Sequence, residues 1–244
     1  MSINSVNWQL IGHANNVVAM TALNGTLYAA TSDNKLWVRV AIPGDINWQL
    51  IGHANNVIAM TALDETLYAA TSENKLWVRV AIRGDINWQV IGHANNVVAM
   101  AAMDEKLYAA TSEDQLWIRA IVTEDRGWQA ITVANNIVTM TAMDGKLYAV
   151  SSDDKFWVRD GRVDLNWKQI GRGISVISLA ATNNQLYAVT FDHKLWQVNL
   201  TSDGIKWQEI GHANNVVAMA GMDGKLYAAT SDHQLWCWTI DSEV

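Results

Sequence analysis

The fold is decided by residues 8–47, which read WQLIGHANNVVAMTALNGTLYAATSDNKLWVRVAIPGDIN. Four short runs rich in Val, Leu, Thr, Trp and Tyr alternate here with the breaks GHANN, NG, SDNK and AIPGD. A helix does not survive such frequent breaks, whereas short strands joined by tight turns do. Asn24-Gly25 is in addition a two-residue hairpin signal. Residues 8–47 therefore predict four antiparallel strands.

The segment returns six times along the 244 residues, at a period of 40 with one deletion near residue 160. Two tryptophan series mark the period: Trp8, Trp48, Trp88, Trp128, Trp167, Trp207 and Trp37, Trp77, Trp117, Trp157, Trp196, Trp236. Repeats of about 40–45 residues built from short strands are typical of β-propeller blades. The sequence thus predicts an all-β fold, a six-bladed β-propeller of four-stranded antiparallel blades.

We expect a single domain over residues 1–244. The repeats span residues 8–47, 48–87, 88–127, 128–166, 167–206 and 207–244. The chain begins with the strand that comes last in each blade, so residues 8–11 must pair with the C-terminal strands of residues 216–240 to close the ring. Alanine-rich strands suit the crowded axis, and we expect most tryptophans to fill the core between blades.

Composition excludes several classes of function. The net charge is −7 and the basic residues are scattered, so nucleic acid is not an expected partner. No run of residues is long and apolar enough for membrane insertion, and no secretory signal precedes Trp8, so we expect a cytoplasmic protein. The lone Cys237 cannot form an intrachain disulfide. We expect no cofactor, and a homo-oligomer is left open.

The polar residues gather on one face of the predicted disc. The GHANN loops link successive blades there and meet the turns that begin at Ser32. The candidate binding residues are His13, Asn15, Asn16, His53, Asn55, Asn56, His93, Asn95, Asn96, Asn135, Asn136, His212, Asn214 and Asn215. Asparagine amides and imidazoles beside apolar walls suit the hydroxyl groups of a sugar.

Each of these residues also has a structural interpretation. A Gly-His pair at this connection occurs in WD-type propellers, where the histidine joins a structural hydrogen-bond network, and Asn pairs favour left-handed turns. Repeats 4 and 5 keep the tryptophans but have Val133 and Arg172 in place of the histidine. A residue that the scaffold needs is expected in every blade, so this loss favours a ligand-binding role.

An enzyme is not indicated. The carboxylates at the repeated turn position lie one per blade, without a partner that would make an acid–base pair; they are Asp33, Glu73, Glu113 and Asp153. The six histidines are spread over five of the six repeats, so we expect no metal site, and no phosphate loop or nucleophile motif is present.

The alternation of W-x-x-I-G, L-Y-A and L-W resembles the repeats of tectonins, a family of β-propeller lectins, over nearly the whole chain. The resemblance implies a multivalent lectin that recognises glycans on foreign cell surfaces in defence, with O-methylated mannose or fucose as the expected ligands. It places binding at the four intact His-Ala-Asn-Asn loops and at Asn135 and Asn136. The alternative is a WD-like propeller that binds a protein and no sugar.

Overall fold

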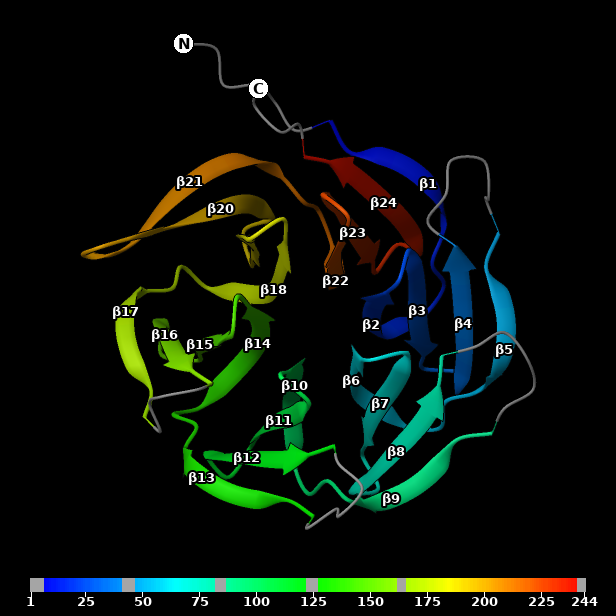
Figure 1. Ribbon diagram of the computed structural model, residues 1–244. Coiled ribbons are helices and arrows are strands. Elements are labelled where there is room, and N and C mark those ends of the chain that lie inside the picture. The colour runs from blue at the N-terminus through cyan, green and yellow to red at the C-terminus, as the bar shows by residue number, and fades with distance from the viewer. Residues whose placement is uncertain (1–6, 41–46, 82–86, 122–126, 162–165, 241–244) are drawn as a thin grey trace.

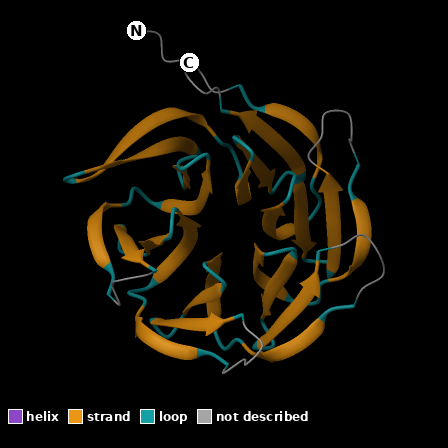
Figure 2. Ribbon diagram, viewed as in Figure 1, coloured by secondary structure: helices purple, strands orange, loops and turns teal. Residues whose placement is uncertain are grey.

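The computed structural model describes residues 7–40, 47–81, 87–121, 127–161 and 166–240. Within these ranges the chain forms six four-stranded antiparallel sheets arranged in a ring, and no helix occurs (Figures 1 and 2). The prediction of a six-bladed β-propeller is confirmed. It follows that no helix of the described part could span a membrane.

In five of the six blades the strands run from the axis to the rim in chain order, and in the sixth the outer strand is the first strand of the chain. The innermost strands are β2 (Val17–Leu23), β6 (Val57–Leu63), β10 (Val97–Met103), β14 (Ile137–Met143), β18 (Val176–Thr182) and β22 (Val216–Met222). The second strands are β3 (Thr26–Thr31), β7 (Thr66–Thr71), β11 (Lys106–Thr111), β15 (Lys146–Ser151), β19 (Gln185–Thr190) and β23 (Lys225–Thr230).

The third strands are β4 (Lys35–Val40), β8 (Lys75–Val80), β12 (Gln115–Ala120), β16 (Lys155–Asp160), β20 (Lys194–Thr201) and β24 (Gln234–Thr239). The outer strands are β5 (Gln49–His53), β9 (Gln89–His93), β13 (Gln129–Val133), β17 (Lys168–Arg172), β21 (Gly204–His212) and β1 (Gln9–His13). We number the blades 1 to 6 from the innermost strands β2, β6, β10, β14, β18 and β22.

The ring closes as predicted. Blade 6 is built from both ends of the chain in the order β1-β24-β23-β22, with Gln9 opposite Cys237 and His13 opposite Gln234 (Figure 1). Each repeat gives its first strand to the preceding blade as the outer strand. The first strand of repeat 1, β1, therefore becomes the outer strand of blade 6. The sequence repeat and the structural blade are therefore offset by one strand.

The core lies between the blades and is graded in size. Ala29 and Ala30 on the second strand are buried, as is Leu36 on the third. Leu27 of blade 1 packs with Ala229 and Leu235 of blade 6, and the same kind of cluster recurs around the ring. Such burial of closely packed apolar side chains supplies the main stabilisation of a ring that has no disulfide.

The turn chemistry is also as expected from the sequence. Asn24 and Gly25 have φ of 48° and 72°, the left-handed pair that a tight hairpin needs. In blade 5 the hairpin between β20 and β21 is continuous, with Thr201 paired to Gly204. That longer hairpin reaches blade 4, where the Ile205 side chain covers the position at which Gly171 would carry a Cβ.

Candidate functional site

The loops that were predicted to bind ligand join one blade to the next. In the loop between β5 and β6, the backbone of Asn56 donates to the Asn34 side chain of blade 1 at 2.8 Å. The Asn56 carbonyl accepts from Ser72 N of blade 2 at 2.9 Å. The second asparagine of the loop is thus a link between two blades.

This link recurs at every junction with different side chains. Its acceptors are Asn34, Asn74, Asp114, Asp154, His193 and His233, and its donors are the backbones of Asn56, Asn96, Asn136, Ser175, Asn215 and Asn16. All twelve residues have positive φ between 53° and 68°. The left-handed interpretation of the second asparagine is therefore correct, and Asn135 shares this conformation with φ of 49°.

The second asparagine is further engaged through its side chain in two blades. Asn56 Nδ2 donates to Glu73 at 2.8 Å, and Asn96 Nδ2 donates to Glu113 at 2.7 Å. These amides already have a partner, so Asn56 and Asn96 are poorer ligand candidates than the asparagine before them.

The first asparagine and the histidine are available instead. Asn15, Asn55, Asn95 and Asn214 are exposed, as are His13, His53, His93 and His212. Among the described residues, none of these eight side chains makes a hydrogen bond or an ion pair. The WD-type network through the histidine is therefore not formed here.

A network without histidine takes its place in blades 4 and 5. Trp157 Nε1 donates to Ser151 Oγ at 3.0 Å, and this hydroxyl donates to Asp153. Trp196, Thr190 and Asp192 repeat the arrangement. In these two blades a serine or threonine hydroxyl, an aspartate and the tryptophan thus form one set that does not include the loop histidine.

Three cavities open between blades beneath these loops. They lie at the junctions of blades 6 and 1, 1 and 2, and 2 and 3, with volumes of about 690, 220 and 570 Å³. Each is bordered by the histidine and first asparagine of one loop and by two tryptophans. The histidine–tryptophan sets are His13, Trp37 and Trp48; His53, Trp77 and Trp88; and His93, Trp117 and Trp128.

The tryptophans of the two series differ in their surroundings. Trp48, Trp88 and Trp128 pack against the inter-blade core, as predicted. Trp37 instead pairs across the strands with Leu50, which is 53% exposed, and lines the cavity wall. The expectation that most tryptophans are core therefore holds for the first series. In the second series, Trp37, Trp77 and Trp117 contribute half-buried rings to the cavity walls, whereas Trp157 packs against the core.

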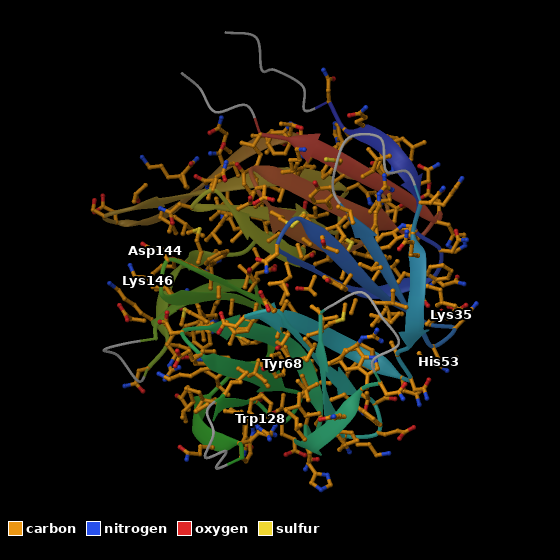
Figure 3. The ribbon with its side chains drawn as sticks, turned by 45° about the vertical axis from the view of Figure 1, so that its right-hand side comes forward. Lys35, His53, Tyr68, Trp128, Asp144 and Lys146 are labelled. Atoms are coloured by element: carbon orange, nitrogen blue, oxygen red, sulfur yellow. The ribbon has the colours of Figure 1, made fainter. Side chains whose placement is uncertain are left out.

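Charged groups surround the cavity openings. Lys35 forms an ion pair with Asp33 at 2.7 Å, and the hydrogen bond from Lys35 lowers the pKa of Asp33. Lys35 also lies opposite His53 across the strands, at the outer edge of blade 1 (Figure 3). The turn carboxylates thus pair with lysines or, in the case of Glu113, accept a hydrogen bond from Asn96.

Sequence reasoning missed the buried arginines at the base of this site. Arg39, Arg79 and Arg119 are 3–5% exposed, and Arg39 Nη2 donates to the Ile11 carbonyl of blade 6 at 2.8 Å. Arg79 and Arg119 line their cavities. The available signal was that an arginine follows the second tryptophan by two residues in repeats 1 to 4 and is replaced by Val198 and Trp238 in repeats 5 and 6.

A metal site is not found in the described part of the chain, where no three His, Cys, Asp or Glu side chains come together as ligands. The cavities combine aromatic walls, amide and imidazole groups and few unpaired charges. Such a surface suits a neutral, hydroxyl-rich ligand with apolar faces.

No family model matches the sequence, and no curated protein matches it. Solved structures share the fold. A chain of the mitotic checkpoint complex has a TM-score of 0.70 at 12% identity, over 99% of this chain and 93% of that chain. The WD40 repeats of RRP9 give 0.69 at 9% identity, over 98% and 99%. A chain of a nidogen/laminin complex gives 0.67 at 15% identity, over 84% of each. At these identities the likeness establishes a β-propeller.

Proposed function

We propose that this protein is a multivalent lectin that binds neutral glycans, with O-methylated mannose or fucose as the preferred ligands. The observation that carries the proposal is the threefold recurrence of one cavity, with the same histidine, asparagine and two tryptophans each time. A propeller that binds one protein has no need for identical sites at successive blades.

The cavity chemistry fits a sugar ring. The unpaired amide of Asn15 offers both donors and an acceptor to neighbouring hydroxyl groups, and the half-buried ring of Trp37 offers an apolar face. An O-methyl group would lie against such apolar walls.

Several weak sites on one molecule bind a repetitive surface more tightly together than each site binds alone. A single shallow sugar site binds with a Kd of about 1 mM, whereas linked sites on a repetitive surface gain roughly 10²-fold or more in avidity. The recurrence of near-identical blades is explained by this use. Glycans on foreign cell surfaces would be the natural targets, and a cytoplasmic protein would meet them only after cell damage or uptake.

The direct test is a glycan array that contains O-methylated mannose and fucose beside the unmethylated sugars, probed with the labelled full-length protein. We expect binding to a narrow set of glycans, competed by the free O-methylated sugar. Binding that ignores methylation would retain the lectin and remove the methyl preference. A blank array with folded protein would overturn the proposal.

A second function is favoured by one feature of the same face. The residue after the first valine or isoleucine of each innermost strand is β-branched and 39–45% exposed; the six are Val18, Ile58, Val98, Val138, Ile177 and Val217. An exposed apolar ring of this kind suits a protein partner, and WD40 propellers are among the structural neighbours. A blank array together with tight binding to one protein would support this alternative.

A further inference from the structure

The six tryptophans of the first series divide into two groups by the partner of the indole N–H. Trp8 Nε1 donates to the His212 carbonyl and Trp207 Nε1 to the Arg172 carbonyl, both at 2.8 Å. The indole nitrogens of Trp48, Trp88, Trp128 and Trp167 are buried and have no hydrogen-bond partner within the part of the chain that the structure describes. A buried donor without a partner is costly, so its persistence calls for an explanation.

Three of the four unpaired N–H groups lie at the cavities, and the fourth, that of Trp167, belongs to the junction whose loop carries Val133 in place of the histidine. Trp48, Trp88 and Trp128 line the three cavities described above. By the repeat, the carbonyls that would correspond to those of His212 and Arg172 belong to His13, His53 and His93, on the opposite side of each cavity. The same tryptophan therefore bridges the junction in one group and borders an open space in the other.

A buried arginine distinguishes the two groups. The junctions with an unpaired indole have Arg39, Arg79, Arg119 or Arg159 on the third strand, whereas Val198 and Trp238 stand there at the other two junctions. The guanidinium takes up room beside the outer strand: a Cβ at Gly52 would lie 2.9 Å from Arg79 Nη1, and a Cβ at Gly92 would lie 2.8 Å from Arg119 Nη1. An arginine head bonded to the carbonyl before this glycine thus separates the loop from the tryptophan.

The backbone of the outer strand agrees with this division. Gly12, Gly52 and Gly92 have φ of 154°, 146° and 154°, a conformation that other residues rarely adopt. Among the described residues, their equivalents Thr132, Gly171 and Gly211 do not have positive φ. Junctions with arginine and a cavity thus have a distinct strand geometry immediately before the histidine.

Resting on the proposed lectin function, we propose that the indole N–H groups of Trp48, Trp88 and Trp128 donate to an acceptor oxygen of the bound sugar. Arg39, Arg79 and Arg119 act as positioning residues that keep these donors available. The loop at His212 has the intact His-Ala-Asn-Asn sequence but is not a binding site, because its indole partner is already bonded to the loop. The protein therefore has three complete sites rather than one per blade.

Indole resonances provide the most direct test. The thirteen tryptophans give thirteen indole N–H signals in a nitrogen-15 correlation spectrum of the full chain, assigned by single Trp→Phe changes. On titration with an O-methylated mannose, we expect the signals of Trp48, Trp88 and Trp128 to move and those of Trp8 and Trp207 to stay. Equal movement at all junctions, or binding that moves none of the three, would overturn the inference while leaving the lectin intact. If no sugar binds in the array or the titration, the lectin proposal itself fails, and this inference with it.

Trp→Phe substitutions separate the N–H from the ring. The triple change W48F/W88F/W128F keeps an aromatic wall, and we expect sugar affinity to fall roughly fivefold to tenfold. Its Tm falls only through the packing that the smaller rings lose, because no protein hydrogen bond is removed. The matched control W8F/W207F loses similar packing and two hydrogen bonds as well, so we expect a larger fall in Tm per substitution with unchanged affinity. The same loss of affinity in both variants, or none in the first, would contradict the proposal.

The positioning role of the arginine is tested at one junction. In R79M the apolar stem is retained and the guanidinium removed, and we expect the Trp88 indole signal to shift toward those of Trp8 and Trp207 as its N–H bonds the loop. Sugar should then no longer perturb Trp88 while it still perturbs Trp48 and Trp128. A Trp88 signal that keeps its position and its response to sugar would overturn the positioning role. General unfolding would be recognised by the collapse of all thirteen signals, and R79K would then be used with the same readout.

Discussion

The junction of blades 6 and 1 and the junction of blades 5 and 6 carry the same loop sequence, His-Ala-Asn-Asn, in different surroundings. At the first, Arg39 is bonded to the Ile11 carbonyl, and Trp48 faces a cavity of about 690 Å³. At the second, Trp238 stands in place of the arginine, and Trp8 donates to the His212 carbonyl. Identical loops therefore do not make identical sites.

The difference shows where the site is determined. The loop supplies the polar groups, but the third strand of the following blade decides whether there is room beneath them. At the junction of blades 5 and 6, Trp238 packs on Trp8 with ring centroids 6.5 Å apart and on Tyr187 at 5.6 Å. Aromatic packing fills that junction, whereas a guanidinium and a cavity occupy the other.

The largest effect is expected from removing the first asparagines of the three cavity loops. In N15A/N55A/N95A we expect glycan binding to fall by more than about 100-fold, because each site loses several hydrogen bonds to sugar hydroxyls. Tm should stay near that of the unaltered protein, since these exposed side chains bond no other described residue. Titration calorimetry and thermal unfolding measure the two quantities.

The matched control is N214A, which makes the same change at the junction of blades 5 and 6. We expect its affinity and the number of bound sugars to be unchanged. Loss of one site in N214A would break the distinction between the two junctions and restore the interpretation that all four intact loops bind. Full binding by the triple variant would remove the asparagines from the site.

The second prediction compares a residue of the cavity wall with a residue of the core at adjacent positions of β4. Leu36 is fully buried, and L36A should cost about 3 kcal/mol of unfolding free energy. Trp37 is half-buried on the cavity wall, so W37A should cost less, about 1–2 kcal/mol, while weakening sugar binding at that junction. Denaturant unfolding and calorimetry of both variants test this order. A loss for W37A as large as that for L36A, with binding retained, would place Trp37 in the core.

Most of the fold could be predicted from the sequence, because the period of 40 residues is found by comparing the sequence with itself. Two tryptophan series and the Asn24-Gly25 turn determine blade number, strand order and closure by Trp8 without knowledge of any side-chain contact. Hydrophobic patterning reports which residues face another sheet, and here it repeats six times.

The site was only partly predictable. The loops connect neighbouring blades, as predicted, but the two asparagines of each loop appear alike in sequence, and only the backbone shows that Asn16 links blades while Asn15 does not. The role of Arg39 could not be predicted, because the sequence does not show whether an arginine is buried or exposed. Its replacement by Val198 and Trp238 was visible, but its meaning depends on which carbonyl the guanidinium bonds.

A third prediction uses the tyrosines that lie at the two kinds of junction. Burial raises the pKa of Tyr187 to about 12, and its neighbour Trp238 carries no charge to oppose this. Burial also raises the pKa of Tyr108, but the Arg159 guanidinium over its ring opposes the rise. We therefore expect Tyr108 to ionise at lower pH than Tyr187 in an absorbance titration compared with Y108F and Y187F.

The raised pKa of Tyr187 makes the folded protein less stable at high pH. Between about pH 10 and 12 folded Tyr187 keeps its proton while the unfolded residue loses it, so stability is present below pH 10 and is lost as the pH rises through this window. The contribution lost by pH 11 is about 1 kcal/mol. Unfolding of Y187F at pH 9 and 11 should show a smaller decline than that of the unaltered protein; an equal decline would show that Tyr187 ionises alike in both states.

The smallest effect concerns the links on either side of the closing blade. His193 Nδ1 and His233 Nδ1 each accept from a loop backbone at 3.3 Å, where other junctions use asparagine or aspartate. Replacing both imidazoles by alanine removes these acceptors and leaves the backbone N–H groups of Asn215 and Asn16 without their partners. H193A/H233A should therefore lose about 0.5–1 kcal/mol of unfolding free energy per link.

The chain supplies its own control, because Asn34 and Asn74 make the same link with an amide oxygen as the acceptor. H193N/H233N keeps an acceptor at both positions, so its Tm should match that of the unaltered protein while the Tm of H193A/H233A falls. Thermal unfolding of the two variants measures this difference. An equal fall in Tm for both variants would show that the acceptor atom does not stabilise the links, and the closing blade would then depend on the packing of the imidazole rings instead.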